Sequence, residues 1–237
     1  MPVIGVFAGP TLSGKSTLRE RVSALPEFKD VPVVVADNLR DQWFNKPICQ
    51  PEADYCYELA RQEIKSYAIG SKREPVIFCE MPLRHGRKHQ DELVYMAEQI
   101  EVYLEDISRA KANEHEHIDT AVHLRVMTLF ARLDVIPGRV EKRVAEPNTS
   151  RTSVFQLEKY LRVCAAYHVP TRYEPLYLNT SDESDFGNAS TLALAVQFLK
   201  SGRHPEDNNI RREAFVGIIK EARDQAIGRK LGWSDML

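Results

Sequence analysis

The residues best suited to chemistry stand near the N-terminus, in Gly9-Pro10-Thr11-Leu12-Ser13-Gly14-Lys15-Ser16, which is followed by Thr17. This segment satisfies the pattern G-x-x-x-x-G-K-[ST] in full. Its glycines let the backbone curl so that successive N–H groups point at phosphate oxygens, and its lysine can reach the β- and γ-phosphates. The hydroxyl of Ser16 is a group that ligates Mg²⁺ beside such phosphates. The sequence therefore predicts a nucleoside triphosphate site over residues 9–17.

Two acidic residues follow apolar runs elsewhere in the chain. Asp37 comes after Val33-Val34-Val35-Ala36, and Glu80 comes after Val76-Ile77-Phe78-Cys79. Ligands of an open parallel sheet lie over the carboxyl ends of its strands, so both carboxylates are expected to face the phosphates. One carboxylate is needed near Mg²⁺, and a second could orient an acceptor hydroxyl or take its proton. Spacing alone does not divide these roles, and either acid could instead be a helix cap.

Arginines and lysines follow the fourth apolar run, at Arg132, Arg139, Lys142 and Arg143. Arg139 and Arg143 are four residues apart, a spacing that puts them on one helix face. Mobile arginines that close on a phosphoryl group stabilise its developing charge and exclude water, which favours transfer over hydrolysis. The alternative is a solvated basic helix.

A second cationic group lies near the two acids: Arg40 follows Asp37, while Arg84 and Arg87 follow Glu80. Such residues suit an acceptor that carries phosphate, carboxylate or a nucleic-acid backbone. A charged loop that merely caps the next helix is the alternative.

These residues need elements to position them, and the chain predicts strands that alternate with helices. Strands are expected at 3–8, 31–36, 75–79, 121–126 and 176–178, and helices at 16–25, 52–69, 93–107, 154–165 and 192–199. This alternation predicts an α/β fold, a mostly parallel sheet with helices on both faces. Residues 201–209 form a polar linker, and a stripe of five apolar residues follows: Phe215, Ile218, Ile219, Ala222 and Ala226. The stripe must be buried, either on this domain or in a contact with a partner or a second copy.

Composition narrows the classes of function. The chain has 237 residues and a net charge of −2, so no global basic field favours long nucleic acid. Its four cysteines are scattered, and it shows neither a charged-then-apolar leader nor an apolar stretch that could span a membrane. We expect a cytoplasmic protein with no membrane partner.

With these features, the chain resembles the P-loop kinases of the polynucleotide-kinase-like and zeta-toxin-like group, the AAA-type kinases, over about residues 3–199. The resemblance rests on the loop at 9–17, Asp37-Asn38-Leu39-Arg40, the arginine-bearing segment, and Asn179-Thr180-Ser181-Asp182. It implies a three-layer P-loop NTPase sandwich with a five-stranded sheet of order 2-3-1-4-5. It also implies a kinase domain at 1–200 with a lid at 132–152. The linker and the apolar stripe that follow it predict a C-terminal helical extension at 201–237.

The same resemblance implies roles for individual residues. Asp182 would lie beside adenine, Glu80 would serve Mg²⁺ together with Ser16, and Asp37 would serve the acceptor hydroxyl. Many relatives carry Asp where this chain has Glu80, so the roles of the two acids could be exchanged. The implied catalytic set is Lys15, Asp37, Glu80, Arg139 and Arg143.

The implied activity is transfer of the γ-phosphoryl group of ATP, with Mg²⁺, to a hydroxyl of a small molecule, a nucleotide-sugar or a polynucleotide 5′ end. The alternative is a P-loop ATPase or nucleotide-dependent switch that uses the C-terminal helix as a partner surface, and a homo-oligomer through that helix also stays open. The chain contains no N/T-K-x-D motif, which disfavours guanine specificity. A degenerate nucleotide binder is disfavoured because Lys15, Ser16 and both acids are intact.

Overall fold

A computed structural model describes residues 2–43, 50–70, 76–82, 86–111, 120–145, 153–165, 167, 173–181 and 189–229. The strands are β1 (Val3–Gly9), β2 (Val33–Val35), β3 (Val76–Pro82), β4 (His123–Phe130) and β5 (Leu176–Asn179). The helices are α1 (Lys15–Ser23), α2 (Ala36–Trp43), α3 (Gln50–Gly70), α4 (Gly86–Lys111), α5 (Ile136–Ala145), α6 (Ser153–Ala165), α8 (Ala189–Ser201) and α9 (Asn208–Gly228), with short 3-10 turns η1 (Pro26–Phe28) and η3 (Leu133–Val135). Among these described helices, none is both long and apolar enough to cross a membrane.

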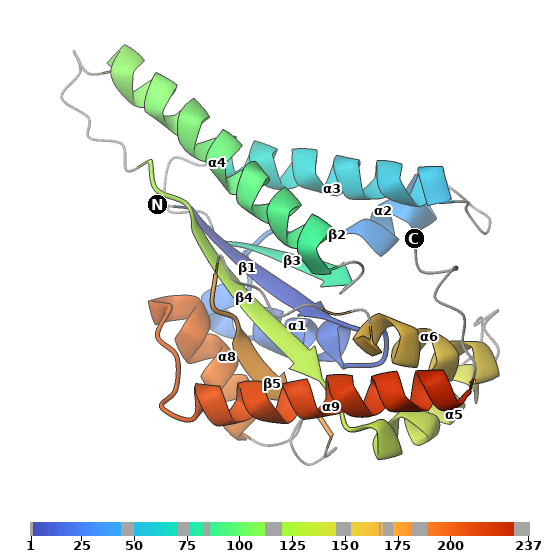
Figure 1. The fold of residues 1–237 in the computed structure, drawn as a ribbon. Helices are drawn as coiled ribbons and strands as arrows, with labels where there is room; N and C mark the ends of the chain where they lie inside the picture. Colours follow the sequence, from blue (N-terminus) through green and yellow to red (C-terminus); the bar gives the residue numbers. More distant parts are fainter. Residues whose placement is uncertain are drawn as a thin grey trace.

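The five strands form one sheet in the order β2-β3-β1-β4-β5, and every neighbouring pair is parallel (Figure 1). This confirms the α/β fold and the strand order that the resemblance implied. β1 occupies the centre, with Phe7 opposite Glu80 of β3 and Ala8 opposite Thr128 of β4. The carboxyl ends of β1, β3 and β4 therefore meet at one edge of the sheet, where the loop after β1 begins.

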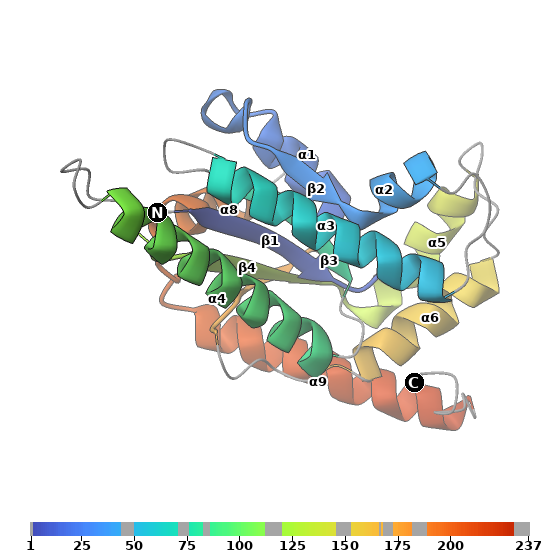
Figure 2. The ribbon, with the colours of Figure 1, turned by 90° about the horizontal axis from the view of Figure 1, so that it is seen from above.

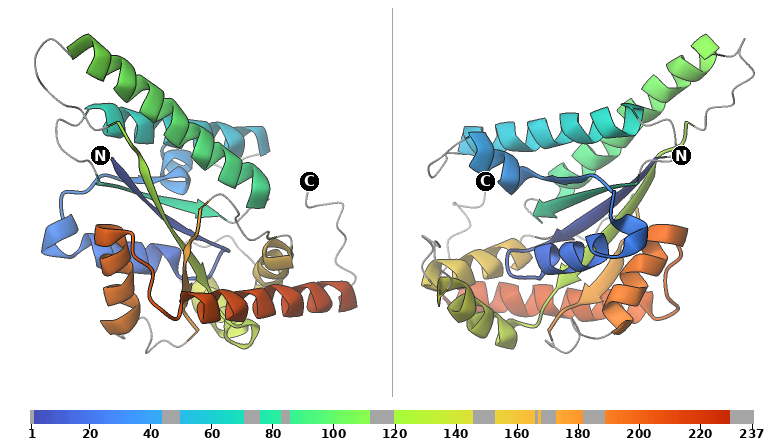
Figure 3. Two further views of the ribbon diagram at one scale, coloured as in Figure 1. Left: turned by 60° about the vertical axis from the view of Figure 1, so that its left-hand side comes forward. Right: turned by 180° about the vertical axis from the view of Figure 1, so that it is seen from behind.

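Side-chain alternation along the strands separates two hydrophobic layers. In β1, Ile4, Val6 and Ala8 join the cluster that holds the buried side chains of α3 and α4, whereas Phe7 joins the cluster with α1 and α8. Figures 1 and 3 show α3 and α4 over one face of the sheet and α1 and α8 over the other. A strand covered on both faces must be apolar throughout, and all seven residues of β1 are buried.

The C-terminal helix α9 runs beside β5 and α6, as Figure 2 shows from above. The ring of Phe215 lies 5.1 Å from that of Phe130, 4.9 Å from that of Tyr167 and 5.6 Å from that of Tyr177. The whole apolar stripe is buried in this way: Phe215, Ile218, Ile219, Ala222 and Ala226. The stripe thus packs on its own domain.

Two element boundaries near the site differ from the sequence expectation. β3 continues through Pro82, so Glu80 lies inside the strand and does not follow it. The backbone of Glu80 pairs with Phe7 of β1 and Val35 of β2, and this pairing does not depend on the side chain. α2 begins at Ala36, so Asp37 lies in the first turn of a helix rather than in a loop. A carboxylate in that position is favoured by the positive end of the helix dipole.

Candidate phosphate-binding site

The loop between β1 and α1 depends on glycine at two positions. A Cβ on Gly9 would lie 2.5 Å from the main-chain oxygen of Leu129 and 2.4 Å from the Oγ of Ser13, which excludes any side chain there. Gly14 has φ of 85°, and Leu12 adopts φ of 72° although it carries a side chain. The loop therefore contains two left-handed residues, one of which, Leu12, carries a side chain that disfavours this conformation.

The N-terminus of α1 is left open to an anion. Its N-cap is Gly14, which offers no side-chain hydrogen bond, and its first turn contains no acidic residue. The first N–H groups of a helix have no intrahelical partner, and the helix dipole adds positive potential there. The arrangement is that of a phosphate cradle.

Lys15 lies at the centre of the charged groups. Its Nζ donates a hydrogen bond of 2.9 Å to the main-chain oxygen of Pro10, so the ammonium folds back over the loop. Partial burial lowers the pKa of the Lys15 ammonium to about 8, against the opposing effects of Glu80 and then Asp37. Both predicted acids therefore lie within electrostatic reach of this lysine.

Two cations also act on Lys15, and both lower its pKa: Arg143 of α5 and Lys159 of α6. Arg143 is half-buried and was predicted as a site residue, and α5 does carry Arg139 and Arg143 on one helix. The sequence analysis did not predict Lys159 as a site residue. Within its own segment it is one of several polar residues on an amphipathic helix. Its approach to the loop depends on how α6 packs against the sheet, which no local pattern encodes.

Ser16 and Glu80 form a candidate metal pair at the open side of the loop. The Ser16 hydroxyl donates to Glu80 Oε2 over 3.0 Å, and the Glu80 side chain is 9% exposed. Two neighbouring ligands of an octahedral Mg²⁺ lie about 2.9 Å apart, given metal–oxygen distances of roughly 2.1 Å. The spacing and the oxygen chemistry of this pair fit Mg²⁺.

Arg19, which sequence reasoning missed, holds the other oxygen of the same carboxylate. Its Nε lies 2.5 Å from Glu80 Oε1, and its Nη2 lies 3.0 Å from Glu20. Arg19 stands one helical turn after Ser16, so both side chains project from α1 toward Glu80. The i, i+3 spacing was the available signal, but its partner lies on a distant strand.

Arg139 reaches the loop from α5 but contacts its main chain. Its Nη1 donates to the oxygen of Leu12 over 2.8 Å and to Thr180 Oγ1 over 3.2 Å, and its Nη2 donates to the oxygen of Thr180. The sequence prediction placed this guanidinium on the transferring phosphoryl group. That catalytic role stays a prediction, and the observed contacts are those of a loop support.

The predicted acceptor side is only partly described. Asp37 is exposed in the first turn of α2, near Lys15 in electrostatic terms. Arg40 and Arg87 belong to α2 and α4, but their side chains are outside the described part of the structure, and Arg84 and Asp182 lie outside the described residues altogether.

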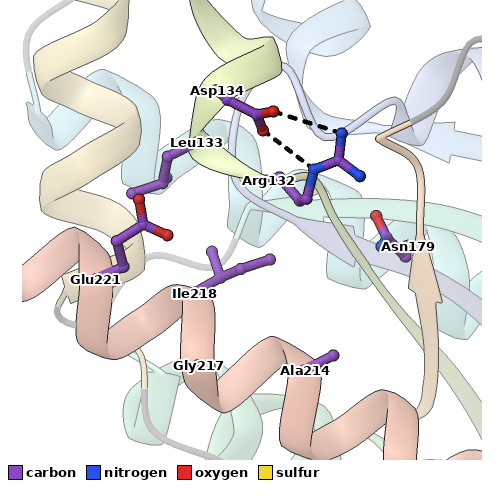
Figure 4. A pocket seen from close by; sticks show the side chains of 8 residues that line it. All are labelled: Arg132, Leu133, Asp134, Asn179, Ala214, Gly217, Ile218 and Glu221. Carbon is purple, nitrogen blue, oxygen red and sulfur yellow. Dashed lines mark hydrogen bonds and ion pairs between the residues drawn. The ribbon is translucent and has the colours of Figure 1, made fainter.

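A cavity of about 410 Å³ opens beside the end of β5 (Figure 4). Arg132 and Asp134, which pair over 3.1 Å, line it together with Asn179, while Ile218 and Glu221 approach from α9. No residue of the loop 9–17 lines this cavity. It adjoins the phosphate site through Asn179 and Thr180 and is distinct from it.

Comparison with known proteins supports the fold. No protein family model matches the chain, and no curated protein matches it. The solved structure of a candidate kinase from Chloroflexus aurantiacus aligns with a TM-score of 0.50 at 15% identity, covering 85% of this chain and 97% of that one. At this identity the likeness shows a common fold.

Two further structures align more distantly. A sugar kinase from a Janibacter species matches with a TM-score of 0.44 at 15% identity, covering 94% of this chain and 98% of that chain. A structure of the PezAT toxin–antitoxin system of Streptococcus pneumoniae matches with a TM-score of 0.35 at 14% identity, covering 94% and 87%. Both are too distant to add to the first.

Proposed function

We propose that this chain is an ATP-dependent kinase that transfers the γ-phosphoryl group to a hydroxyl of a small molecule, a nucleotide-sugar or a polynucleotide 5′ end. The observation that carries the proposal is the Ser16–Glu80 pair, 3.0 Å apart, at the open side of a complete phosphate loop. The catalytic domain would comprise residues 1–200 with a lid at 132–152, and residues 201–237 would be an extension whose helix α9 packs on the domain.

In this proposal the loop and α1 bind the phosphates. The N–H groups near Gly14 would donate to the phosphate oxygens, and the Lys15 ammonium would leave the Pro10 oxygen to bridge the β- and γ-phosphates. Ser16 and Glu80 would hold Mg²⁺, and a bound Mg²⁺ offsets negative charge on the phosphates. Arg19 fixes the orientation of the Glu80 carboxylate.

The acceptor would approach from the α2 side. Asp37 would orient the acceptor hydroxyl and take its proton, which its exposure and its proximity to Lys15 allow. Arg40, Arg84 and Arg87 would bind anionic groups of the acceptor. Arg143 would stabilise charge on the transferring group, and Arg139, the second predicted lid arginine, would have to leave its Leu12 and Thr180 contacts to join it.

The base of ATP would lie toward the segment after β5, where the resemblance places Asp182. The cavity lined by Arg132 and by Asn179, at the end of β5, has ample volume for a purine. An arginine face and a carboxamide are groups that stack on and hydrogen-bond to adenine.

The test is a transfer screen with γ-labelled ATP across nucleosides, sugars, nucleotide-sugars and oligonucleotides with free 5′ hydroxyls. Wild-type protein should label one acceptor class, and Lys15→Ala should label none. ATP hydrolysis without any labelled acceptor would overturn the kinase proposal in favour of an ATPase or a switch. Wild-type rates in Lys15→Ala would remove the loop from the mechanism.

A further inference from the structure

We infer that Arg139 and Thr180 form a clamp that holds the main chain of Leu12 and Ser13 in its phosphate-binding conformation. The two residues are thus positioning residues for nucleotide phosphates. This inference rests on the nucleotide site of the proposed function and is independent of which acceptor is used.

The clamp brings together three segments that are distant in sequence. Thr180 Oγ1 lies 2.9 Å from the oxygen of Ser13 and 2.9 Å from the oxygen of Phe130. The Arg139 guanidinium donates to the oxygen of Leu12 and to both oxygens of Thr180. Two consecutive carbonyls of the loop are therefore held from outside the motif.

The Thr180 hydroxyl lies near two carbonyl oxygens but can donate only one hydrogen bond. The hydroxyl has one hydrogen, and the oxygen of Phe130 already accepts the backbone N–H of Thr180 over 2.8 Å. The hydroxyl hydrogen is therefore better used on the oxygen of Ser13. Arg139 Nη1 fills a lone pair of the hydroxyl and polarises it.

This contact determines where the next N–H points. The C=O and N–H of a trans peptide are antiparallel, so a Ser13 carbonyl turned toward Thr180 directs the Gly14 N–H to the opposite side of the loop. Gly14 is the N-cap of α1, and its N–H is one of those offered to a phosphate. The clamp thus orients a phosphate donor that it never touches.

Leu12 gives a second reason for a clamp. Its φ of 72° is left-handed, a conformation that is unfavourable for a non-glycine residue and persists only where the surroundings fix it. Arg139 bonds to the carbonyl of that residue over 2.8 Å. A loop that kept this conformation only upon nucleotide binding would bind more weakly, because ordering would oppose binding.

Burial makes the clamp hard to replace by solvent. Ser13 and Thr180 are both 0% exposed, so water cannot substitute for a lost hydroxyl without structural change. Arg139 also anchors α5 at the loop, and Arg143 stands one turn further along the same helix, near Lys15. The clamp therefore sets the position from which Arg143 acts.

The test compares Thr180→Val, which keeps the shape but removes the hydroxyl, with Thr180→Ser, which keeps the hydroxyl. Calorimetry should show ADP binding about tenfold weaker in Thr180→Val, the cost of one lost buried hydrogen bond, and within about twofold of wild type in Thr180→Ser. Adenosine, which has no phosphate, should bind equally to all three proteins. Unchanged ADP affinity in Thr180→Val, or an equal loss for adenosine, would overturn the clamp.

Arg139→Lys provides a second variant if Thr180→Val does not fold, as judged by circular dichroism and thermal unfolding. A lysine cannot span the Leu12 and Thr180 oxygens together, so ADP should again bind about tenfold more weakly, with adenosine unaffected. Arg139→Lys that binds ADP as wild type does would overturn the clamp. If wild-type protein binds ADP but labels no acceptor, the kinase proposal fails while the clamp stands.

Discussion

The phosphate loop is held on two sides, and the two sides use different parts of it. On the β3 side, Glu80 meets the side chain of Ser16 and the charged Arg19. On the β5 side, the clamp of Arg139 and Thr180 meets main-chain carbonyls. The first side therefore depends on residue types within the loop motif, whereas the second depends only on the path of the backbone.

This difference separates chemistry from positioning. A carboxylate beside a hydroxyl can take part in metal binding and charge stabilisation. On the β5 side, a hydroxyl and a guanidinium hold neutral main-chain carbonyls. These contacts fix the geometry of the loop. Variants on the β3 side should therefore change the rate of transfer most, and clamp variants should change the affinity for phosphates most.

The largest effect is expected on the β3 side, in Glu80→Gln. Loss of this charge should lower kcat by roughly 10³-fold, because it removes the charged one of the two oxygen ligands proposed for Mg²⁺. Mn²⁺ affinity in the presence of ADP should fall as well, measured by electron paramagnetic resonance. Glu20→Gln is the matched control, since Glu20 contacts the same Arg19 over 3.0 Å but its side chain is 66% exposed.

The same two assays, applied to Asp37→Asn, distinguish the role of Asp37 from that of Glu80. If Asp37 serves the acceptor, its variant should lose kcat while Mn²⁺ affinity stays within about twofold of wild type. The reverse result, with metal affinity lost in Asp37→Asn and kept in Glu80→Gln, would exchange the two assignments.

A smaller effect on kcat is expected in Arg143→Ala, on α5 and outside the clamp. Its guanidinium acts on Lys15 through space, and charge builds up on the phosphoryl group during transfer, so kcat should fall by roughly 10²-fold. The dissociation constant for ATP should rise by only about threefold, because the contact strengthens in the transition state. Equal losses in kcat and in ATP affinity would mean that Arg143 only attracts the charged nucleotide and does not stabilise the transition state.

Lys142→Ala is the matched control for Arg143, since Lys142 is the neighbouring cation on α5 and is exposed. Its kcat should stay within about twofold of wild type, as expected for a surface charge. A loss as large as that of Arg143→Ala would mean that the overall charge of α5, rather than one arginine, supports transfer.

The same contrast explains what the sequence could predict. Gly9, Gly14 and Lys15 are favoured by residue type, so the motif names them. A Cβ would collide at Gly9, Gly14 has φ of 85°, and the phosphates need a cation on a long side chain. The α/β fold was also predictable, since each strand is an apolar run bounded by a helix pattern. The strand order came only from the resemblance to P-loop kinases, because apolar runs do not show which strands are neighbours.

The clamp and Lys159 were not predictable from local pattern. Any residue at positions 12 and 13 offers the same carbonyl oxygens, so nothing in the loop sequence indicates that Thr180 and Arg139 bind there. Asp37 was placed after a strand, but whether it begins a helix depends on the packing of α2 against α3. These contacts come from tertiary structure.

The smallest expected effect is a pH dependence that begins at Lys15, the residue between the two sides. The pKa of its ammonium is about 8 in the free protein, below the ordinary 10.5, and bound phosphates should raise it again. Binding then requires proton uptake above pH 8, so ADP affinity should fall about threefold from pH 7.5 to 8.5. This window lies above the ionisation of the phosphates themselves.

Folding stability should respond in the opposite direction. Between pH 8 and 10.5 the unfolded chain binds more protons at Lys15 than the folded chain, so the contribution of this group to the free energy of unfolding rises with pH. Calorimetry in two buffers of different ionisation enthalpy would count the protons taken up on ADP binding. Lys15→Arg is the control, since a guanidinium stays charged throughout and its ADP affinity should not change between pH 7.5 and 8.5. An equal pH dependence in both proteins would assign the titration to another group and leave Lys15 fully charged between the two sides of the loop.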